Sequence, residues 1–324
     1  MRALICEAYG APKTLEFKDI PVLAPGDGQV LVRVSHVGLN FFDGLVVAGR
    51  YQVRPEPPFS PGSEIAGVIE ACGSGVTDLA VGMPVMAACL YGGMAEYCLV
   101  DAINAVALPP DMDFAIGAAM TIVYATACHA LVQRATLQAG ETVLVLGAAG
   151  GTGLAAVEVA NALGARVIAC ASTDEKCALA VDHGADGSVN YVAGDLRAQL
   201  RELAHAGVDV VFDPVGGDLS EPCFRSLAPG GRHLVIGFAG GAIPSLALNL
   251  PLVKEASLVG VYQGAFSRRE PDAHRQNMER IFAWQREGLV RPVIDRTFPL
   301  EEGAAAIRYL LDRRARGKVL VQVG

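Results

Sequence analysis

The sequence predicts an α/β protein in which a doubly wound parallel sheet is inserted within a β-rich domain. Three observations indicate this fold. Short strands separated by Gly and Pro turns occupy residues 1–120, strands alternate with helices from residue 141 onward, and the chain ends in a further strand at residues 318–323. Such alternation is typical of βαβ units, which pair their strands in parallel and cover both faces of the sheet with helices.

The N-terminal segment is expected to be mainly β. Residues 29–35 are rich in β-branched side chains, with Val at every second position from Val30 to Val34. Residues 65–72 and 95–100 are expected to form further strands. Frequent Gly and Pro residues separate these runs, so a compact barrel or an irregular β domain is predicted.

A helical pattern begins near residue 115, and an alternating block follows it. The expected helices are residues 115–132, 153–163, 173–183 and 275–286, and the expected strands are residues 142–146, 166–171, 208–212, 231–236 and 257–262. The last of these strands is expected at the edge of the sheet. We therefore divide the chain into residues 1–120 in the first domain, 121–260 in the inserted domain and 261–324 returning to the first domain.

The composition excludes several classes of protein. The 324 residues are 52% hydrophobic and 19% charged, which suits two domains with substantial cores and argues against disorder. A formal net charge of −8 disfavours general nucleic-acid binding, which needs a basic surface. No apolar run is seen that reaches the roughly 18 residues needed to span a bilayer, and the N-terminus lacks the features of a signal peptide. We expect a cytoplasmic protein with no nucleic-acid or membrane partner.

The eight cysteines are scattered along the chain, and no two of them form a Cys-x-x-Cys pair. Their spacing matches neither a zinc ribbon nor a small disulfide scaffold. We expect reduced, buried thiols and no metal site.

A glycine-rich turn, Gly147-Ala-Ala-Gly-Gly-Thr-Gly153, lies between an expected strand and an expected helix. In this context glycines allow a tight turn and a close approach of the backbone to a pyrophosphate, whose charge the free N–H groups of the helix start then stabilise. We expect a dinucleotide to bind here, against Ala149, Gly150, Gly151 and Thr152. An ordinary glycine-rich βα turn is the alternative.

The end of the next strand distinguishes NADPH from NADH. An enzyme that uses NAD usually has an acid at this position, which accepts hydrogen bonds from the ribose hydroxyls. Here Ser172 and Thr173 follow the strand and the first acid is Asp174, so no carboxylate would repel a 2′-phosphate. Lys176 and Tyr191 would add a cation and a phenol. The sequence therefore predicts NADPH. For Lys176 taken alone, a solvated lysine on the helix surface is the alternative.

Further cofactor contacts are expected where the later strands of the inserted domain end. Val215 follows the strand at residues 208–212, and Gly237 and Phe238 follow the next strand. Open α/β sheets bind ligands at the carboxyl ends of their strands, so these residues should border the dinucleotide.

Seven motifs occur in order along the chain: Gly38-Leu-Asn40-Phe-Phe-Asp43, Pro61-Gly62-Ser-Glu64-Ile-Ala-Gly67, Gly75-Val-Thr77-Asp, Tyr124-Ala-Thr126-Ala, Ala148-Ala-Gly-Gly-Thr-Gly153, Asp213-Pro-Val215-Gly-Gly217 and Gly317-Lys318-Val. Together they resemble the medium-chain dehydrogenase/reductase superfamily, in its zinc-free quinone oxidoreductase branch, over essentially the whole chain. The resemblance implies a GroES-like catalytic domain enclosing a Rossmann domain, with the active site in the cleft between them. It also implies a homodimer that pairs edge strands, for which residues 256–262 are the candidate.

Departures from the zinc-dependent members narrow the expected chemistry. Those members have a Cys where this chain has Asn40, and a Gly-His-Glu motif where it has Gly62-Ser63-Glu64. A catalytic zinc needs three protein ligands, and without zinc no Lewis acid polarises an alcohol oxygen. We therefore expect hydride transfer from NADPH to an activated acceptor, such as a quinone or another α,β-unsaturated carbonyl.

The resemblance also implies roles for single residues. Asn40 would bond the acceptor carbonyl, and Tyr51 would orient a quinone oxygen or donate a proton. A turn residue and a half-buried loop aromatic are the respective alternatives, and a second pocket tyrosine of some relatives is Leu45 here. Contacts with the cofactor near its nicotinamide are implied for Phe41, Phe42, Thr126, Tyr262 and Gly264. Lys318 matches a terminal basic residue close to the cofactor. A structural role is the alternative for Lys318.

Two other functions are compatible with the sequence. The first is an enoyl-thioester reductase of the acrylyl-CoA type, which would need a basic groove for the coenzyme phosphates. Arg50, Arg54, Arg268 and Arg269 are candidates for that groove. The second is a non-catalytic NADPH-binding sensor.

Overall fold

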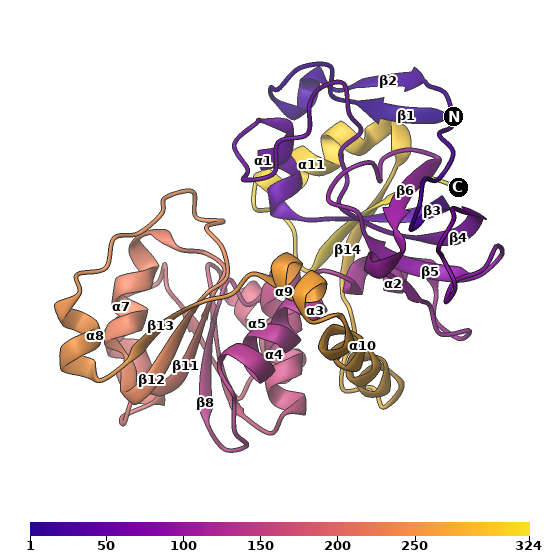
Figure 1. The fold of residues 1–324 in the computed structure, drawn as a ribbon. Helices are drawn as coiled ribbons and strands as arrows, with labels where there is room; N and C mark the ends of the chain where they lie inside the picture. The colour runs from indigo at the N-terminus through magenta and orange to yellow at the C-terminus, as the bar shows by residue number, and fades with distance from the viewer. The chain divides into compact units, whose positions relative to one another are not determined.

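The computed structural model describes residues 1–324, which fold into two compact units (Figure 1). The first unit comprises Met1–Ile122 and Pro292–Gly324, and the second comprises Val123–Arg291. We expected the return to the first domain at residue 261, but residues 261–291 group with the second unit. The reason is that helix α10 (Pro271–Arg286) packs on α3 (Val123–Cys128) and α9 (Gln263–Arg269) of that unit.

A mixed sheet forms the centre of the first unit. Its strands follow the order β14 (Ile294–Pro299), β15 (Lys318–Gln322), β3 (Gln29–Leu39), β4 (Glu64–Cys72), β5 (Pro84–Ala88) and β7 (Ala105–Ala107), and β6 (Tyr97–Asp101) also pairs with β3. A separate antiparallel pair joins β1 (Arg2–Ile5) to β2 (Glu16–Asp19). The C-terminal strand β15 lies antiparallel to β3, which confirms that the end of the chain returns to the N-terminal part.

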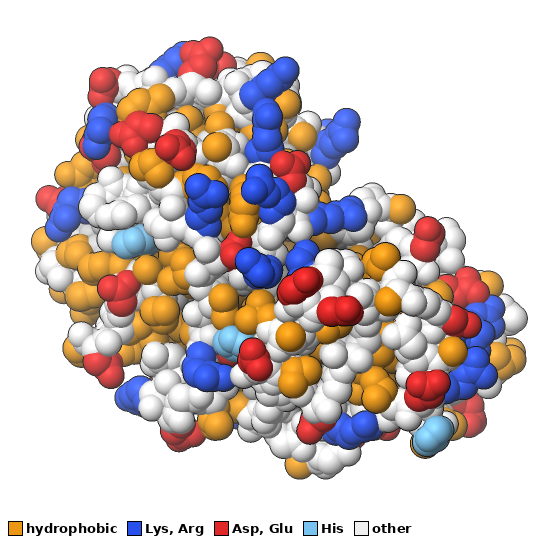
Figure 2. Space-filling view, turned by 180° about the vertical axis from the view of Figure 1, so that it is seen from behind, with side chains coloured by type: hydrophobic (Ala, Val, Ile, Leu, Met, Phe, Trp, Pro, Cys, Tyr) orange, Lys and Arg blue, Asp and Glu red, His pale blue; other side chains and the backbone are white.

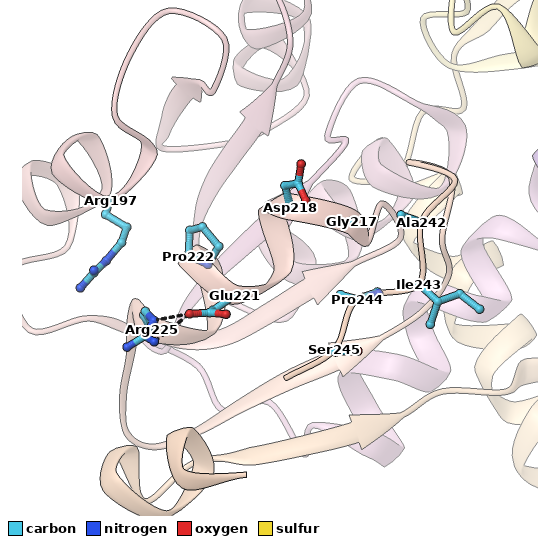
Figure 3. A pocket seen from close by; sticks show the side chains of 10 residues that line it. All are labelled: Arg197, Gly217, Asp218, Glu221, Pro222, Arg225, Ala242, Ile243, Pro244 and Ser245. Atoms are coloured by element: carbon cyan, nitrogen blue, oxygen red, sulfur yellow. Dashed lines mark hydrogen bonds and ion pairs between the residues drawn. The ribbon is translucent and has the colours of Figure 1, made fainter. Parts of the chain in front are cut away.

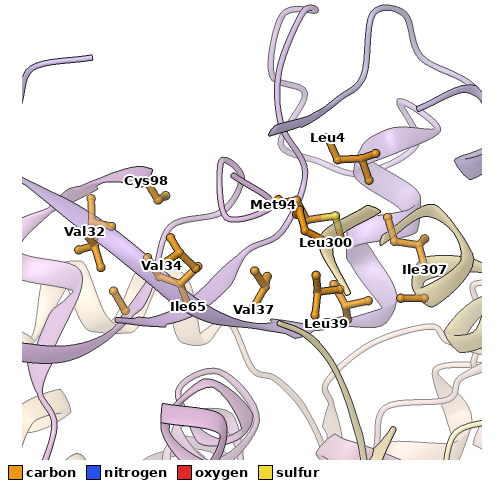
Figure 4. Close-up of a cluster of buried hydrophobic side chains, with 14 of the residues drawn as sticks. Leu4, Val32, Val34, Val37, Leu39, Ile65, Met94, Cys98, Leu300 and Ile307 are labelled. Carbon is orange, nitrogen blue, oxygen red and sulfur yellow. The ribbon is translucent and has the colours of Figure 1, made fainter. Parts of the chain in front are cut away.

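Helices of the first unit are short. They are η1 (Pro12–Thr14), α1 (Phe41–Val47), η2 (Ala102–Asn104), α2 (Phe114–Met120), η5 (Leu300–Glu302) and α11 (Gly303–Leu311). Figure 4 shows the core that they share with the sheet, where Val32, Val34 and Leu39 of β3 lie among residues such as Ile65 and Ile307. Each such buried aliphatic side chain stabilises the fold by about 1.5–3 kcal/mol. This core spans β3, β4 and α11, and so it fixes the position of the C-terminal segment within the unit.

Six parallel strands form the sheet of the second unit. In spatial order they are β10 (Gly187–Asn190), β9 (Arg166–Ala171), β8 (Thr142–Leu146), β11 (Val208–Asp213), β12 (Leu227–Val235) and β13 (Ser257–Gly260). Numbered within the unit, this is the order 3-2-1-4-5-6 of doubly wound dinucleotide-binding sheets. The predicted fold class is therefore confirmed, and β13 is an edge strand as expected.

The helices of the second unit connect these strands. They are α3, the π-helix η3 (His129–Arg134), α4 (Gly151–Ala162), α5 (Asp174–Asp182), α6 (Leu196–Leu203), η4 (Gly217–Leu219), α7 (Ser220–Arg225), α8 (Asn249–Lys254), α9 and α10. All residues from Val143 to Leu146 of the central strand β8 are buried. Side chains on both faces of a parallel strand are expected to be buried when helices cover both faces of the sheet.

One helical stretch differs from its expected form. The helix expected at residues 115–132 divides into α2, α3 and η3, and the boundary between the units falls between Ile122 and Val123. The stretch Phe114–Arg134 is long and apolar enough to cross a membrane by length and composition, which the sequence expectation overlooked. However, 72% of its most apolar window is buried inside the protein, as in a core helix of a soluble protein.

Candidate functional site

The glycine turn joins β8 to α4 in the second unit. Gly147 has a φ of +59°, which favours glycine, and a Cβ on Gly153 would lie 2.2 Å from the Gly147 carbonyl oxygen. Helix α4 begins at Gly151, two residues earlier than expected, and its N-cap Gly150 has no side chain to accept the first N–H groups. A turn of glycines and small residues that ends in uncapped N–H donors fits the phosphates of a dinucleotide.

Three of the expected adenosine-side residues lie on neighbouring segments. Tyr191 donates its backbone N–H to the Ala171 carbonyl at 3.1 Å, which places the end of β10 beside Ser172 at the end of β9. Lys176 lies in the first turn of α5, which starts two residues after Ser172. Ser172, Lys176 and Tyr191 therefore gather at one corner of the sheet.

Neighbouring polar groups at that corner are already occupied. Thr173 is the N-cap of α5, and its hydroxyl oxygen accepts the Lys176 backbone N–H at 3.3 Å. The carboxylate of Asp174 accepts a hydrogen bond of 2.7 Å from the Asn190 amide. Since these contacts engage both side chains locally, Ser172 rather than Thr173 is the better candidate for a 2′-phosphate contact.

Asp213 at the end of β11 shapes the next loop, and the sequence reasoning noted its motif but not its role. Its Oδ1 accepts the backbone N–H groups of Val215 at 2.9 Å and Gly216 at 2.7 Å. Its Oδ2 accepts from the Ser220 hydroxyl at 2.6 Å and lies 3.0 Å from His233 Nε2. Burial opposes the charge, but the hydrogen bonds outweigh it and lower the pKa of Asp213. The carboxylate thus holds Val215 in place. The sequence feature that indicates this structural role is an acid at the end of a mainly apolar strand.

The other expected residues of the second unit follow the same strand ends. Phe238, which is 37% exposed, lies next to Gly216, so the loops after β11 and β12 are adjacent. Strand β13 ends at Gly260 rather than residue 262, and Tyr262, half exposed, is the N-cap of α9. Thr126 is the only residue of α3 that is not buried.

Within the first unit, Lys318 is the centre of a buried polar cluster. Its Nζ donates to Glu64 Oε2 at 2.7 Å, to the Leu39 carbonyl at 2.9 Å and to Asn40 Oδ1 at 3.0 Å. Lys318 is 3% exposed and Glu64 is fully buried. All three N–H donors of the ammonium are engaged within the protein. These contacts favour the structural alternative for Lys318, in which it holds Asn40 and Glu64.

Asn40 lies at the N-cap of α1, where its backbone N–H donates to Asp43 Oδ2 at 2.7 Å. Because an ammonium only donates, the amide atom facing Lys318 must be the oxygen, which fixes the orientation of the amide. Its Nδ2 donates to Glu64 Oε2 at 2.9 Å, while its contacts to Gly38 and Ser63 are both 3.4 Å. One N–H of Asn40 is thus well bonded and the other is only weakly bonded.

These residues stand at the positions where zinc-dependent relatives have their ligands. Asn40 and Ser63 offer neutral oxygen atoms, and the carboxylate of Glu64 already pairs with the ammonium of Lys318. A divalent cation there would face that ammonium at close range, and the ligand set lacks the Cys and His that zinc prefers. The donor set does not fit a catalytic zinc.

Tyr51 and Phe42 form a stacked aromatic pair in the first unit, with ring centroids 4.9 Å apart and planes at 15°. Both rings are half-buried, and Phe41 starts α1 beside them, also half-buried. The stack holds the Tyr51 ring in a set orientation. Asn40, Phe41, Phe42 and Tyr51 therefore gather around the start of α1.

Asp43 gives a prediction for stability against pH. Burial raises the pKa of Asp43 to about 7, although hydrogen bonds from the Asn40 N–H and Ser63 hydroxyl and the charge of Lys318 act in the opposite direction. Above its ordinary pKa of 3.8 the unfolded chain loses this proton while the folded protein keeps it up to about 7, so the free energy of unfolding falls across that range. Asp43→Asn should reduce this decline, as measured by urea unfolding at about pH 5 and about pH 8.

A matched control for that measurement is Asp113→Asn, which changes an exposed helix N-cap in the same unit. It should retain the decline of the wild type. An Asp43→Asn protein whose stability falls with pH as steeply as that of the wild type would contradict the assignment.

A pocket elsewhere in the second unit has a volume of about 540 Å³ (Figure 3). It lies among α6, η4, α7 and residues 242–245, and Figure 3 shows Arg225 paired with Glu221 at its wall. None of the residues predicted for the cofactor or the acceptor lines it. On the face drawn in Figure 2, acidic side chains lie among the basic ones, so that face carries no purely basic stripe.

Family models match both parts of the chain. Residues 26–111 match the alcohol dehydrogenase GroES-like domain, and residues 151–280 match the zinc-binding dehydrogenase domain. Asn40 and Ser63 lie within the range matched by the GroES-like model, not within that of the zinc-binding dehydrogenase model.

Individual proteins are similar over the full length. Quinone oxidoreductase-like protein 2 from Bos taurus is 40% identical over 99% of this chain and 92% of its own length. The quinone oxidoreductase of Thermus thermophilus, solved alone and with NADPH, is 34% identical over 100% of both chains, with a TM-score of 0.86. The Escherichia coli quinone oxidoreductase complexed with NADPH is 25% identical over 100% of both chains, with a TM-score of 0.93.

Proposed function

Since the chain belongs to the quinone oxidoreductase branch of the medium-chain dehydrogenase/reductase superfamily, we propose that it is an NADPH-dependent reductase of quinones or other α,β-unsaturated carbonyl compounds. The observation that carries the proposal is the end of β9, where Ser172, Lys176 and Tyr191 gather. The strand end itself has Ser172 where enzymes that use NAD have an acid. The uncapped start of α4 supports it, because its N–H groups suit a pyrophosphate. The NADPH complexes of similar enzymes add to this support.

Bound NADPH would supply a hydride to the electrophilic carbon of the acceptor. In this proposal Ala149 to Thr152 hold the pyrophosphate, while Thr126, Val215 and Phe238 border the rest of the dinucleotide. The weakly bonded N–H of Asn40 donates to the acceptor carbonyl, and Lys318 and Glu64 keep the amide in that orientation. Tyr51, held by its stack on Phe42, orients the acceptor or delivers a proton.

The decisive experiment measures NADPH and NADH oxidation with a panel of quinones, enones and enoyl-CoA thioesters. Turnover of a quinone or a simple enone with NADPH supports the proposal. Preference for an enoyl-CoA would identify an enoyl-thioester reductase instead. Tight NADPH binding with no turnover of any acceptor would favour a sensor, and a strong preference for NADH would overturn the assignment of Ser172 and Lys176.

Cofactor choice should change when an acid is placed at the end of β9. Ser172→Asp puts a carboxylate where we propose the 2′-phosphate, so the KM for NADPH should rise about tenfold or more while the KM for NADH changes little. Steady-state kinetics with both cofactors measures this. Ala178→Asp adds the same charge at an exposed position on α5 and should leave the cofactor ratio unchanged. An equal effect of both variants on NADPH would contradict the assignment.

We also propose that the protein is a homodimer formed through β13. This edge strand carries Leu258, which is 53% exposed, and the adjacent α8 exposes Leu252 and Val253. An unpaired edge beside apolar side chains favours pairing with a second copy. Leu258→Lys should shift the protein towards monomer in analytical ultracentrifugation, whereas Val192→Lys, at an exposed position in the same unit, should not. A wild type that sediments as a monomer would refute this interface.

A further inference from the structure

Glu158 is a buried carboxylate that none of the proposed cofactor contacts uses. It lies in α4, is 1% exposed, and is flanked by apolar buried residues such as Val157 and Val159. Burying a carboxylate is costly unless hydrogen bonds satisfy its oxygens. The contacts that satisfy Glu158 therefore indicate what it holds in place.

Three parts of the second unit converge on this carboxylate. The Tyr124 hydroxyl of α3 donates to Oε2 at 2.6 Å, and the Arg291 backbone N–H donates to the same oxygen at 3.1 Å. His183 Nδ1, just after α5, lies 2.6 Å from Oε1. Arg291 is also anchored by its guanidinium, which donates to the Asp182 carbonyl at 3.0 Å. One side chain of α4 thus joins α3, the end of α5 and the last residue of the unit.

The hydrogen bond between Glu158 and Tyr124 connects α4 to α3, the helix that carries the proposed cofactor contact Thr126. Tyr124 is 2% exposed and points to α4, whereas Thr126, two residues later, is the only residue of α3 that is not buried. Residues two apart in a helix point in nearly opposite directions. Tyr124 therefore lies on the face of α3 that packs against α4, and Thr126 lies on the opposite, partly exposed face. The same α4 that carries Glu158 begins at the glycine turn.

We propose that Glu158 is a positioning residue that fixes Thr126 relative to the glycine turn through the hydroxyl of Tyr124. The inference rests on the proposed function, in which the turn binds the pyrophosphate and Thr126 lies beside the nicotinamide. If the hydrogen bond between Tyr124 and Glu158 is lost, the pyrophosphate site stays intact, because the glycine turn itself is unchanged. The nicotinamide contact moves, and hydride transfer is sensitive to small displacements.

The test compares Tyr124→Phe, which removes one hydroxyl and keeps the ring, with Glu158→Ala and with Asn161→Ala. Asn161 is the matched control because it lies on α4, three residues after Glu158. Its side chain donates to the Gly184 carbonyl, just after α5, and this hydrogen bond involves neither α3 nor Arg291. For each protein we would measure the Kd for NADPH, kcat with the best acceptor, the emission spectrum of bound NADPH and the Tm.

Tyr124→Phe is expected to lower kcat about tenfold while the Kd for NADPH stays within about twofold, a split that loss of fold does not produce. Glu158→Ala should lower kcat at least as much and also lower the Tm, and Asn161→Ala should lower only the Tm. The inference is overturned if Tyr124→Phe keeps the kcat of the wild type, or if Asn161→Ala loses as much kcat.

Failure of the proposed function would be recognised separately, as a wild type that binds NADPH and reduces no acceptor. In that case the emission of bound NADPH decides the inference. A changed nicotinamide emission in Tyr124→Phe, with that of Asn161→Ala unchanged, supports the positioning role. Identical emission spectra in all the proteins overturn it.

Discussion

Replacing Gly153 by Ala is expected to abolish tight NADPH binding and to destabilise the second unit. The new Cβ would lie 2.2 Å from the Gly147 carbonyl oxygen and 2.8 Å from the Ala148 Cα, and all of these close atoms belong to the backbone. The turn must therefore move as a whole, at a cost of about 1–3 kcal/mol or more. A displaced turn no longer aims the N–H groups of α4 at the pyrophosphate, so the Kd for NADPH should rise about a hundredfold or more.

Isothermal titration calorimetry for NADPH and thermal unfolding measure these two effects. Gly187→Ala is the matched control, because its Cβ would make only ordinary contacts of 3.7 Å with Leu203 in the same unit. That variant should bind NADPH as the wild type does. Unchanged NADPH affinity in a folded Gly153→Ala protein would show that the dinucleotide binds elsewhere.

The second large effect is expected from Lys318→Met, which removes a buried ammonium and keeps the length of the side chain. Glu64, which is fully buried, then loses its counter-charge, and Asn40 loses the donor that orients its amide. Removing one partner of a buried ion pair typically costs about 3–5 kcal/mol. Urea unfolding should show a loss of this size, and kcat should fall because the Asn40 amide loses the donor to its oxygen and is held in orientation by Glu64 alone.

The double variant Lys318→Met with Glu64→Gln distinguishes the destabilisation caused by an unpaired buried carboxylate from that caused by altered packing. Without a carboxylate no buried charge is left unpaired, so the double variant should be more stable than Lys318→Met alone. Its kcat should remain low, because Asn40 still lacks the ammonium. A Lys318→Met protein as stable as the wild type would mean that Glu64 finds another partner, and the role assigned to Lys318 would then be wrong.

Much of the fold was predictable from the sequence because it depends on local patterns. Apolar β-branched runs such as the one ending at Leu146 form strands wherever both faces are buried, and their alternation with helices permits few topologies. The glycine turn was predictable for the same reason, since its conformation depends on missing side chains within seven consecutive residues. The start of helix α4 at Gly151 and the end of strand β13 at Gly260 were less well predicted, because capping and pairing partners set such boundaries.

The polar clusters were not predictable, because their members are distant in the chain. Lys318 meets Glu64 and Asn40 across more than 250 residues, so the sequence alone could suggest a terminal cation near the cofactor but not that its three donors are already engaged. Glu158 lies in an otherwise apolar part of α4, and nothing in the neighbouring sequence identifies its partners, which are Tyr124, His183 and Arg291.

Three features follow from the amino-acid sequence alone: the doubly wound sheet, the strand that returns at the C-terminus and the glycine turn between β8 and α4. These features depend on periodicity and on side chains that are absent, which short segments encode. The partners of Lys318 and Glu158 are visible only in the folded protein. The role of a buried charged side chain depends on the groups that pair with it. Those groups belong to distant segments that only the folded chain brings together.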